Sequence, residues 1–295
     1  MDVHTHLAPR LAEDDAALPG PPSLRRPEAL AAWLVDRGVD QAWVSIPPPF
    51  YRQGQDHAAT ADWARAVNDG LARRIEGLPS LRRLGYLSLD VPSVAVAELE
   101  RLLDSSDVVG FTGAAGGGSR PLDGKDLAAV WDLLEVGNRP MLLHPGSSAD
   151  PRLDRFYLNN LLGNPVETTV AAAELVLGDV LGSRPALRVA LVHCGGAVPA
   201  LAGRWQQGVE TDRPGIEPLT VDPLQAVRRL WTDALGHSAA VVDLARAVLG
   251  EDRLVLGSDW PFPMGLADPW SAIRHLDPQQ QQRVARDNAS TLAGR

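Results

Sequence analysis

Two histidines stand close to the N-terminus of the chain, in the hexapeptide MDVHTH. Side chains two residues apart in a strand project to the same face, so His4 and His6 can converge on one metal ion when their imidazoles are neutral. An isolated His-x-His pair is equally compatible with two polar residues at an exposed strand end. The pair therefore needs partners elsewhere in the sequence before it indicates a metal site.

Three further groups with metal-binding or proton-transfer chemistry follow short apolar runs. His144 and His193 each come directly after such a run, and Asp259 comes shortly after another. Taken singly, each has a plain structural explanation as a hydrogen-bonded histidine or a turn residue. Their recurrence behind successive runs, together with His4 and His6, favours a shared functional site.

The elements that must position these residues alternate along the chain. Eight short runs rich in Val, Ile and Leu are expected as strands: Met1–Val3, Ala42–Ile46, Leu84–Leu89, Val108–Phe111, Met141–Leu143, Val189–Val192, Leu230–Thr232 and Leu254–Leu256. Helical patterns are expected at Pro27–Arg37, Asp56–Ile75, Val94–Asp104, Lys125–Val136, Pro165–Leu181, Val198–Gln207 and Ser238–Leu249. Eight strands alternating with helices predict a (β/α)8 TIM barrel. A doubly wound open sheet is the alternative, disfavoured because no Gly-x-Gly-x-x-Gly follows the first strand.

In such a barrel the carboxyl ends of the strands form one active-site face, where side chains from separate strands meet. A two-metal site of this kind commonly uses a carbamylated lysine at a strand end, but the only lysine, Lys125, lies in a loop-to-helix segment. One ion is therefore the simpler interpretation, with an open position for water and zinc favoured by the imidazole-rich set. The ligands are expected to be His4, His6, His144 and Asp259.

His193 is then free to exchange protons with the metal-bound water or with a substrate. The neighbouring Cys194 could compete as a nucleophile, although a thiol beside a glycine turn is more often a small filler. The other histidines, His57, His237 and His275, lie in or near helical patterns and carry no expected role.

Composition limits the class of protein. With 295 residues, 45% hydrophobic and 22% charged, the chain can bury one large core, and a single domain over residues 1–295 is expected. The net charge of -9 and the lack of a Lys/Arg block argue against nucleic-acid binding. No apolar run is long enough to span a membrane and no signal sequence is evident, so a cytoplasmic enzyme is expected. The single cysteine fits a reducing compartment.

Three loops stand out for their composition: Ala8–Pro22 is acidic and Pro-rich, Gly113–Gly118 is Gly-rich, and Arg204–Pro223 mixes charge with Gly and Pro. None is expected to form regular structure. A phosphate-binding role for the Gly-rich loop is disfavoured, because no Lys-Ser/Thr follows it.

Several blocks of sequence together resemble the amidohydrolase-related decarboxylases, the family typified by 2-amino-3-carboxymuconate-6-semialdehyde decarboxylase. These blocks are DVHTH at 2–6, LHP at 143–145, ETT at 167–169, HCGGA at 193–197 with GR at 203–204, WTDAL at 231–235 and LGSDWPFP at 256–263. The resemblance implies a (β/α)8 barrel with one zinc ion on His4, His6, His144 and Asp259, and His193 as the acid/base. It also implies a homodimer in which Arg204 binds a substrate carboxylate in the neighbouring subunit.

The chain departs from that family pattern around the substrate. The segment Ala8–Pro27 is too short for the hairpin that carries a second carboxylate-binding arginine, and no motif aligns Arg25 or Arg26 with it. Asn160 takes the place of a pocket tryptophan, and Gly146 replaces an aromatic residue. Substrate contacts are expected from Arg204, Asn160 and Phe262, but with a different substrate.

The expected activity is the non-oxidative removal of a carboxyl group from a small unsaturated or aromatic acid. The metal, beside His193 and Asp259, would stabilise charge and move protons. A metal-dependent hydrolase or hydratase is the alternative, since a zinc-bound hydroxide could attack a carbonyl or an activated alkene with the same residues. A metal-binding barrel without catalysis is a third, disfavoured interpretation. One zinc per chain is expected, with another divalent ion such as Mn²⁺ as an alternative.

Overall fold

A computed structural model of the chain describes residues 1–11, 20–116, 120–146, 148 and 150–294. Among these residues, eight strands form one sheet, and each strand pairs in parallel with the next one along the chain. The strands are β1 (Asp2–His6), β2 (Ala42–Ser45), β3 (Leu81–Tyr86), β4 (Val108–Ala115), β5 (Met141–Pro145), β6 (Val189–Leu191), β7 (Leu230–Asp233) and β8 (Leu254–Val255).

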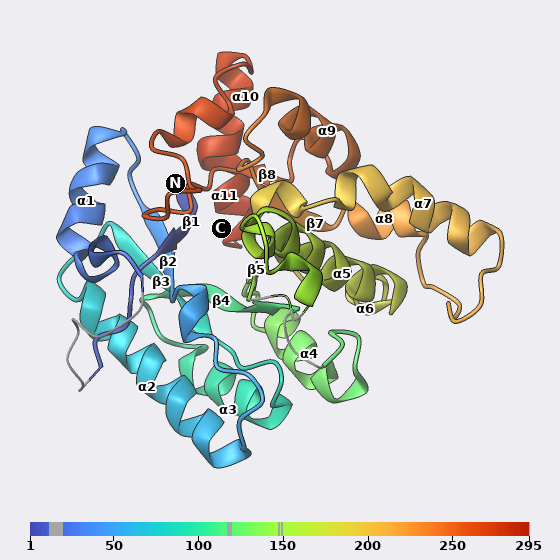
Figure 1. Cartoon of the computed structure of the whole chain (residues 1–295), viewed down its shortest axis with the longest axis horizontal. Helices are drawn as coiled ribbons and strands as arrows, with labels where there is room; N and C mark the ends of the chain where they lie inside the picture. The colour runs from blue at the N-terminus through green and yellow to red at the C-terminus, as the bar shows by residue number, and fades with distance from the viewer. Residues whose placement is uncertain (12–19, 117–119, 147, 149, 295) are drawn as a thin grey trace.

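The first and last strands of the sheet also meet. Val3 N donates to Leu256 O at 2.9 Å, and His6 N donates to Trp260 O at 2.8 Å. The sheet therefore closes into a barrel with helices around it (Figure 1). The predicted (β/α)8 barrel is confirmed. The open-sheet alternative is wrong, because strand order never reverses and the end of the sheet returns to its beginning.

The helices follow the strands in the order that a barrel requires (Figure 1). They are α1 (Pro27–Asp36), α2 (His57–Ile75), α3 (Pro92–Leu102), α4 (Ala128–Val136), α5 (Asn164–Leu177), α6 (Val180–Ser183), α7 (Val198–Glu210), α8 (Pro223–Val227), α9 (Ala239–Leu249), α10 (Pro278–Gln282) and α11 (Asn288–Leu292). None of the helices in the described part of the chain is both long and apolar enough to cross a lipid bilayer.

The core has an outer and an inner part. Two large clusters of buried apolar side chains pack between the strands and the surrounding helices. The inner cluster consists of Val3, Trp43, Leu84, Val109, Leu142, Ala190, Val192, Trp231, Val255, Ala289 and Leu292. Its last two members come from α11, so this helix closes one end of the barrel interior. The interior is thus a packed core, and the polar site must lie at the other end.

The periodicity of the strands explains how polar side chains reach that end. In β2, β5 and β7 an inner-cluster residue precedes a polar residue of the site by two positions, and the two side chains share a face. The pairs are Trp43 and Ser45 in β2, Leu142 and His144 in β5, and Trp231 and Asp233 in β7. Each apolar member anchors its strand in the packed interior, and the polar member projects into the barrel mouth.

Several predicted element boundaries are wrong. Strand β1 extends to His6, so both of its histidines lie within the strand and not behind it. Strand β3 begins and ends about three residues earlier than predicted. The predicted helix Pro165–Leu181 is preceded by a π-helical turn, η6 (Asn159–Gly163), and is interrupted at Asp179, whose φ is +58°.

The loops of unusual composition are more regular than predicted. Strand β4 continues to Ala115, because Gly113 leaves room for its neighbours: an added Cβ would lie 2.8 Å from Met141 Cε. Helix α7 continues to Glu210, and Pro223 begins α8. Residues 22–25 form a short 3-10 helix, η2. Residues 12–19 and 117–119, which were also predicted to be irregular, lie outside the described residues.

Candidate metal centre

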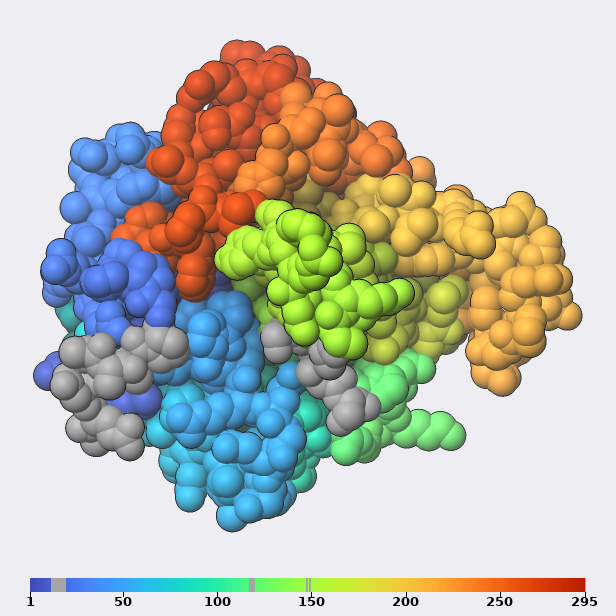
Figure 2. Space-filling model, in the orientation of Figure 1, coloured from blue at the N-terminus to red at the C-terminus, as the bar shows by residue number. Residues whose placement is uncertain are grey.

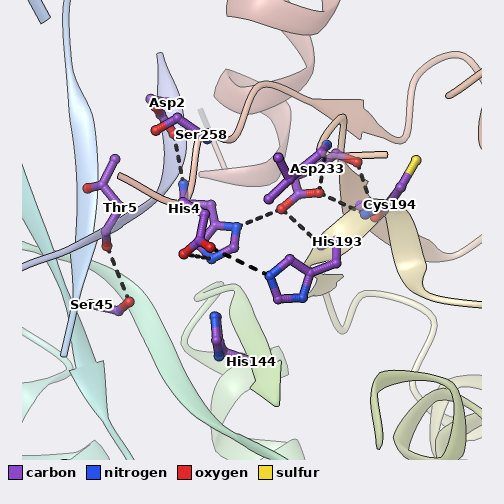
Figure 3. A network of polar contacts seen from close by, with 12 residues as sticks. Asp2, His4, Thr5, Ser45, His144, His193, Cys194, Asp233 and Ser258 are labelled. Atoms are coloured by element: carbon purple, nitrogen blue, oxygen red, sulfur yellow. Dashed lines mark hydrogen bonds and ion pairs between the residues drawn. The ribbon is translucent and has the colours of Figure 1, made fainter. Parts of the chain in front are cut away.

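Four of the predicted site residues converge at the carboxyl end of the barrel. His4 and His6 come from β1, His144 from β5, and Asp259 from the segment after β8. One potential ligand atom from each residue lies within 4.8 Å of all the others, and all four residues are buried. This set could hold a metal ion. Figure 3 shows His4 and His144 of this set, with His193 beside them.

The ligand atoms have the spacing of a coordination sphere. His4 Nε2 lies 3.2 Å from His6 Nε2, and Asp259 Oδ1 lies 3.0 Å from His6 Nε2 and 3.4 Å from His4 Nε2. Nitrogen ligands of a tetrahedral zinc ion are about 3.3 Å apart. His144 Nε2 and Asp259 Oδ1 are buried, and no described residue gives them a hydrogen bond of good geometry. A metal ion would satisfy both atoms, so the donor set fits one.

The outer nitrogen of each imidazole in this cluster is already engaged. His4 Nδ1 lies 2.7 Å from Asp233 Oδ2, and His6 Nδ1 lies 2.9 Å from Ser45 Oγ. His144 Nδ1 lies 2.8 Å from the backbone oxygen of Pro145. Contacts of this kind fix the orientation of metal-binding histidines and direct Nε2 toward the ion.

The electrostatic environment favours the protonation states that a metal ion needs. Burial lowers the pKa of His144 well below its ordinary value, and charge on His6 and His4 would lower it further. Burial also lowers the pKa of His6. Burial alone would raise the pKa of Asp259, but contacts with His193, His4 and His6 hold it well below its usual range. His4 is the exception: burial alone would lower its pKa, but its contact with Asp233 and the charge on Asp259 raise it. Neutral His6 and His144 beside an ionised Asp259 are therefore the favoured arrangement.

His193 stands next to the cluster but outside it. Its Nε2 lies 3.9 Å from Asp259 Oδ2, and its ring centroid is 5.3 Å from those of His4 and His144. The backbone of His193 has a φ of +55°, followed by +56° at Cys194. Two successive non-glycine residues in the left-handed region are strained. This turn directs the imidazole toward the open side of the site.

Cys194 is not placed to act as a nucleophile. Its side chain is buried, and its Sγ lies 3.9 Å from the backbone oxygen of Val241. Burial raises the pKa of the Cys194 thiol, so the reactive thiolate is suppressed at neutral pH. The filler interpretation of this residue accounts for its surroundings.

A cavity of about 260 Å³ opens above the cluster. Its lining includes His144, His193, Asp259, Phe262 and Asn160, so the two predicted substrate residues Asn160 and Phe262 do face it. The segment that carries η6 lies across the centre of this face, drawn in light green in Figure 2. A second lobe of about 260 Å³ shares Asn160, His193 and Asp259 with the first.

Arg204 is not among the residues that line either lobe. It is exposed on α7, which runs outward from the barrel (Figure 1). Lys125 lies in the 3-10 helix η4 (Lys125–Leu127), ahead of α4, and is likewise absent from the cluster and from the cavity lining. The only lysine of the sequence therefore cannot bridge two ions here.

The histidines without an expected role differ in their surroundings. His57 begins α2, and His275 Nε2 lies 3.2 Å from Asp243 Oδ1. His237 lies in the loop between β7 and α9 and lines the second lobe of the cavity. No role was expected for His237, but it lies near the site, because loops after barrel strands surround the mouth.

Three polar residues beneath the cluster were missed by the sequence reasoning. Asp233 ends β7 and contacts His4, Ser45 contacts His6, and Asp2 accepts hydrogen bonds from the backbone N–H groups of His4 and Ser258. Asp233 could have been found, because it follows an apolar run as His144 does. Ser45 carries no comparable signal, since serine commonly ends a strand for structural reasons.

The matched family agrees with this architecture. A family model described as amidohydrolase matches residues 1–294, and the chain belongs to that family. A relative, 2-amino-3-carboxymuconate-6-semialdehyde decarboxylase of Dictyostelium discoideum, is 26% identical over 242 residues, covering 81% of this chain and 67% of that protein. Gamma-resorcylate decarboxylase of Rhodococcus jostii is 26% identical over 280 residues, 87% of this chain and 84% of the relative. The resemblance inferred from the sequence blocks is confirmed.

A solved structure shows the same fold. It is a 5-carboxyvanillate decarboxylase of Novosphingobium aromaticivorans with bound manganese, which superposes with a TM-score of 0.84 at 18% identity. The superposition covers 100% of this chain and 97% of the other. At this level of identity, the likeness concerns the fold alone.

Proposed function

We propose that the protein is a metal-dependent decarboxylase that releases the carboxyl group of a small aromatic or unsaturated acid as carbon dioxide. The observation that carries the proposal is the buried cluster of three imidazoles and one carboxylate, with His193 beside Asp259 at the floor of a cavity. Decarboxylases among its sequence relatives support the same reaction class.

We propose one zinc ion per chain, held by His4, His6, His144 and Asp259, because three imidazoles and a carboxylate suit zinc. Manganese is the alternative, since a structure with the same fold binds it. When bound, such an ion supplies a positive charge that polarises substrate oxygens and acidifies water.

The protein's own residues account for the proton that the reaction needs. When the bond to the carboxyl carbon breaks, its electron pair stays on the substrate carbon, and carbon dioxide leaves. A proton from His193 Nε2 then completes a C–H bond at that carbon, and solvent restores the proton to His193. The position of His193 on the open side of the cluster supports this role.

The cavity favours a flat and partly polar substrate. Phe262, Pro48 and Pro49 supply apolar surface, while Asn160 and Asn164 supply amide donors and acceptors. A volume of about 260 Å³ accommodates one ring with small substituents. We propose that Phe262 packs on the ring and that Asn160 contacts a polar substituent.

We also propose that the active form is a homodimer in which Arg204 reaches the neighbouring site. Among the described residues that line the cavity there is no arginine or lysine, so a substrate carboxylate lacks a fixed cation from its own chain. Exposed apolar side chains beside the mouth support burial against another subunit. They are Phe156, Tyr157, Leu161, Leu162, Val166 and Val170.

Release of labelled carbon dioxide is the decisive test. Zinc-loaded protein would be incubated with hydroxybenzoates, pyridine carboxylates and muconate-like acids that carry ¹³C in the carboxyl group. Metal-dependent release that is lost in His193→Asn supports the proposal. Metal-dependent ring opening of lactones or hydration of double bonds without carbon dioxide would identify the hydrolase or hydratase instead. No turnover of any substrate in the panel would count against both.

Two further expectations remain predictions. One is a single domain over residues 1–295, which limited proteolysis followed by mass measurement would test. The other is a cytoplasmic location, which fractionation of the source cells would test.

A further inference from the structure

One buried carboxylate contacts both the candidate metal cluster and the turn that carries the candidate proton donor. Asp233 ends β7 and is completely buried. It contacts the metal-ligand candidate His4 on one side and the turn that carries His193 on the other, as Figure 3 shows. We propose that Asp233 is a positioning residue that sets the tautomer of His4 and the placement of His193 at the same time. This inference deepens the proposed metal site and rests on it.

Four donors converge on this carboxylate. His4 Nδ1 at 2.7 Å and the His193 backbone N at 3.1 Å face Oδ2. The backbone N–H groups of Cys194 at 2.9 Å and Leu235 at 3.0 Å face Oδ1. Because backbone N–H groups can only donate, the group they surround must be an acceptor on both oxygens. An ionised carboxylate meets that requirement, and an amide does not.

The contact with His4 decides which ring nitrogen can bind metal. A neutral imidazole carries one proton, and a metal ion binds only the nitrogen without it. With an acceptor-only group at 2.7 Å from Nδ1, the proton stays on Nδ1 and Nε2 presents its lone pair to the cluster. Asp233 thereby fixes the binding tautomer of His4.

The contacts with the turn hold a strained conformation. His193 and Cys194 have φ values of +55° and +56°, a conformation that costs free energy in non-glycine residues. Their two N–H groups both donate to Asp233, which stabilises the turn. The same carboxylate therefore positions both the proposed proton donor, His193, and the proposed metal-binding ring of His4.

Asparagine has nearly the same shape as aspartate but carries no charge, so Asp233→Asn tests the role of the charge separately from that of the shape. The amide oxygen of asparagine can accept hydrogen bonds, but its NH₂ group can only donate, so the NH₂ group must face one of the two pairs of donors. Of the four donors, only the His4 ring can become an acceptor at the facing atom, and it does so when its proton moves from Nδ1 to Nε2. Asp233→Asn is therefore expected to put His4 in the tautomer that cannot bind metal through Nε2.

The first measurement is the affinity for Zn²⁺ by competition with a chromophoric chelator, which needs no substrate. We expect Asp233→Asn to bind Zn²⁺ about 10- to 100-fold more weakly than the wild type. Asp233→Ala, which leaves His4 free to adopt either tautomer, is expected to bind Zn²⁺ more tightly than Asp233→Asn although it is less isosteric. A role in shape alone predicts the opposite order, and that order would overturn the proposal.

A matched control separates this effect from a general loss of stability. Glu98 is another buried carboxylate, hydrogen-bonded to Asn68 and Arg101 and remote from the cavity lining. Glu98→Gln is expected to lower the melting temperature but to keep the Zn²⁺ affinity of the wild type. Equal losses of affinity in Glu98→Gln and Asp233→Asn would contradict a specific role for Asp233.

The second measurement needs no folded variant. Long-range ¹⁵N–¹H spectra of ¹⁵N-histidine-labelled wild type, recorded before Zn²⁺ is added, report the proton position on each imidazole. We expect His4 to carry its proton on Nδ1, and a proton on Nε2 would refute the proposal. If the wild type bound no Zn²⁺, the proposed metal site would fall and this inference with it. If it binds Zn²⁺ with the expected tautomer but releases no carbon dioxide, only the decarboxylase assignment fails.

Discussion

His193 and Asp259 come from different strand ends of the barrel, and their facing atoms, Nε2 and Oδ2, lie 3.9 Å apart. The other carboxylate oxygen of Asp259 lies 3.0 Å from His6 Nε2, within the ligand cluster. One side chain thus borders both the candidate metal site and the candidate proton donor. Because His193 is not part of the cluster, its replacement should leave the candidate metal ligands in place.

His193→Asn tests that separation. We expect the variant to retain one equivalent of metal and to lose about 100- to 10,000-fold in kcat, the usual contribution of a general acid or base. Metal content by elemental analysis and turnover by carbon dioxide release would be measured on the same sample. Loss of the metal together with activity would assign His193 to the ligand set instead.

Replacement of a candidate metal ligand, unlike replacement of His193, should lower the metal content. His4→Ala removes one of the convergent nitrogens, so we expect the protein to lose its metal as well as its activity. Wild-type protein purified without added metal should contain close to one equivalent of zinc per chain. Two equivalents would contradict the mononuclear site.

Removal of the metal should also lower stability. Without the ion, His144 Nε2 and Asp259 Oδ1 are buried without a hydrogen bond of good geometry from any described residue. A ligand present at 100 times its dissociation constant stabilises the folded state by about 2.7 kcal/mol. Chelation is therefore expected to lower the melting temperature of the wild type, and His4→Ala should show little further change on chelation.

The sequence predicted these candidate ligands because each lies within or shortly after an apolar strand run. The strands alternate between interior and site residues, so apolar runs that end in His or Asp identify the barrel mouth. Leu142 and His144 are an example: two residues apart, one packs inside the barrel and the other reaches the cluster. Such a rule depends on local sequence alone, and for this reason it could be applied without a structure.

The parts that the sequence did not predict depend on contacts between distant segments. Asp233 follows an apolar run as His144 does, but its contact with His4 spans 229 residues and has no signal in the local sequence. No periodic apolar pattern in the sequence indicates the π-helical turn at Asn159–Gly163. Continuation of β4 through Gly113 depends on the close approach of Met141, which belongs to another strand.

The ion pair between Arg83 and Asp107, which does not line the cavity, is expected to make the stability of the fold depend on pH in the acid range. Arg83 in β3 is almost completely buried and donates to both oxygens of Asp107, which is 44% exposed. Burial alone would raise the pKa of Asp107, but its hydrogen bond with Arg83 lowers it below the ordinary value. The folded-state pKa is thus below the unfolded one, near 3.9, so the pair stabilises the fold above about pH 4. This contribution is lost as the pH falls through the folded-state pKa.

Asp107→Asn is accordingly expected to destabilise the protein at pH 7 by about 1 to 2 kcal/mol, reduced from the value of a fully buried pair because Asp107 is partly exposed. The difference from the wild type should begin to narrow below about pH 4, where the Asp107 carboxyl of the unfolded wild type becomes protonated, and should vanish as the pH falls through the lowered folded-state pKa. Urea unfolding at pH 7 and at pH 3 would measure it. A difference that is unchanged at pH 3 would show that charge is not the cause.

The homodimer proposal makes Arg204 the most informative substitution. Arg204 is exposed on α7 and does not line the cavity of its own chain, so its removal should leave the fold and the metal site intact. If it binds a substrate carboxylate in the neighbouring subunit, Arg204→Ala should lower kcat/KM by about 30- to 1000-fold through loss of a charge-assisted pair. Unchanged activity would show that it is an ordinary surface residue.

Complementation between two inactive variants distinguishes action across an interface from action within a chain. In a mixed dimer of Arg204→Ala and His193→Asn, one of the two sites combines the intact His193 of the first chain with the intact Arg204 of the second. Because equal mixing of a two-fold dimer makes half of the dimers mixed, about one quarter of wild-type activity should return. Native mass spectrometry would confirm that the subunits exchange. Exchange without recovery of activity would refute a role for Arg204 in the neighbouring site, because every mixed dimer is inactive only if His193 and Arg204 must come from the same chain.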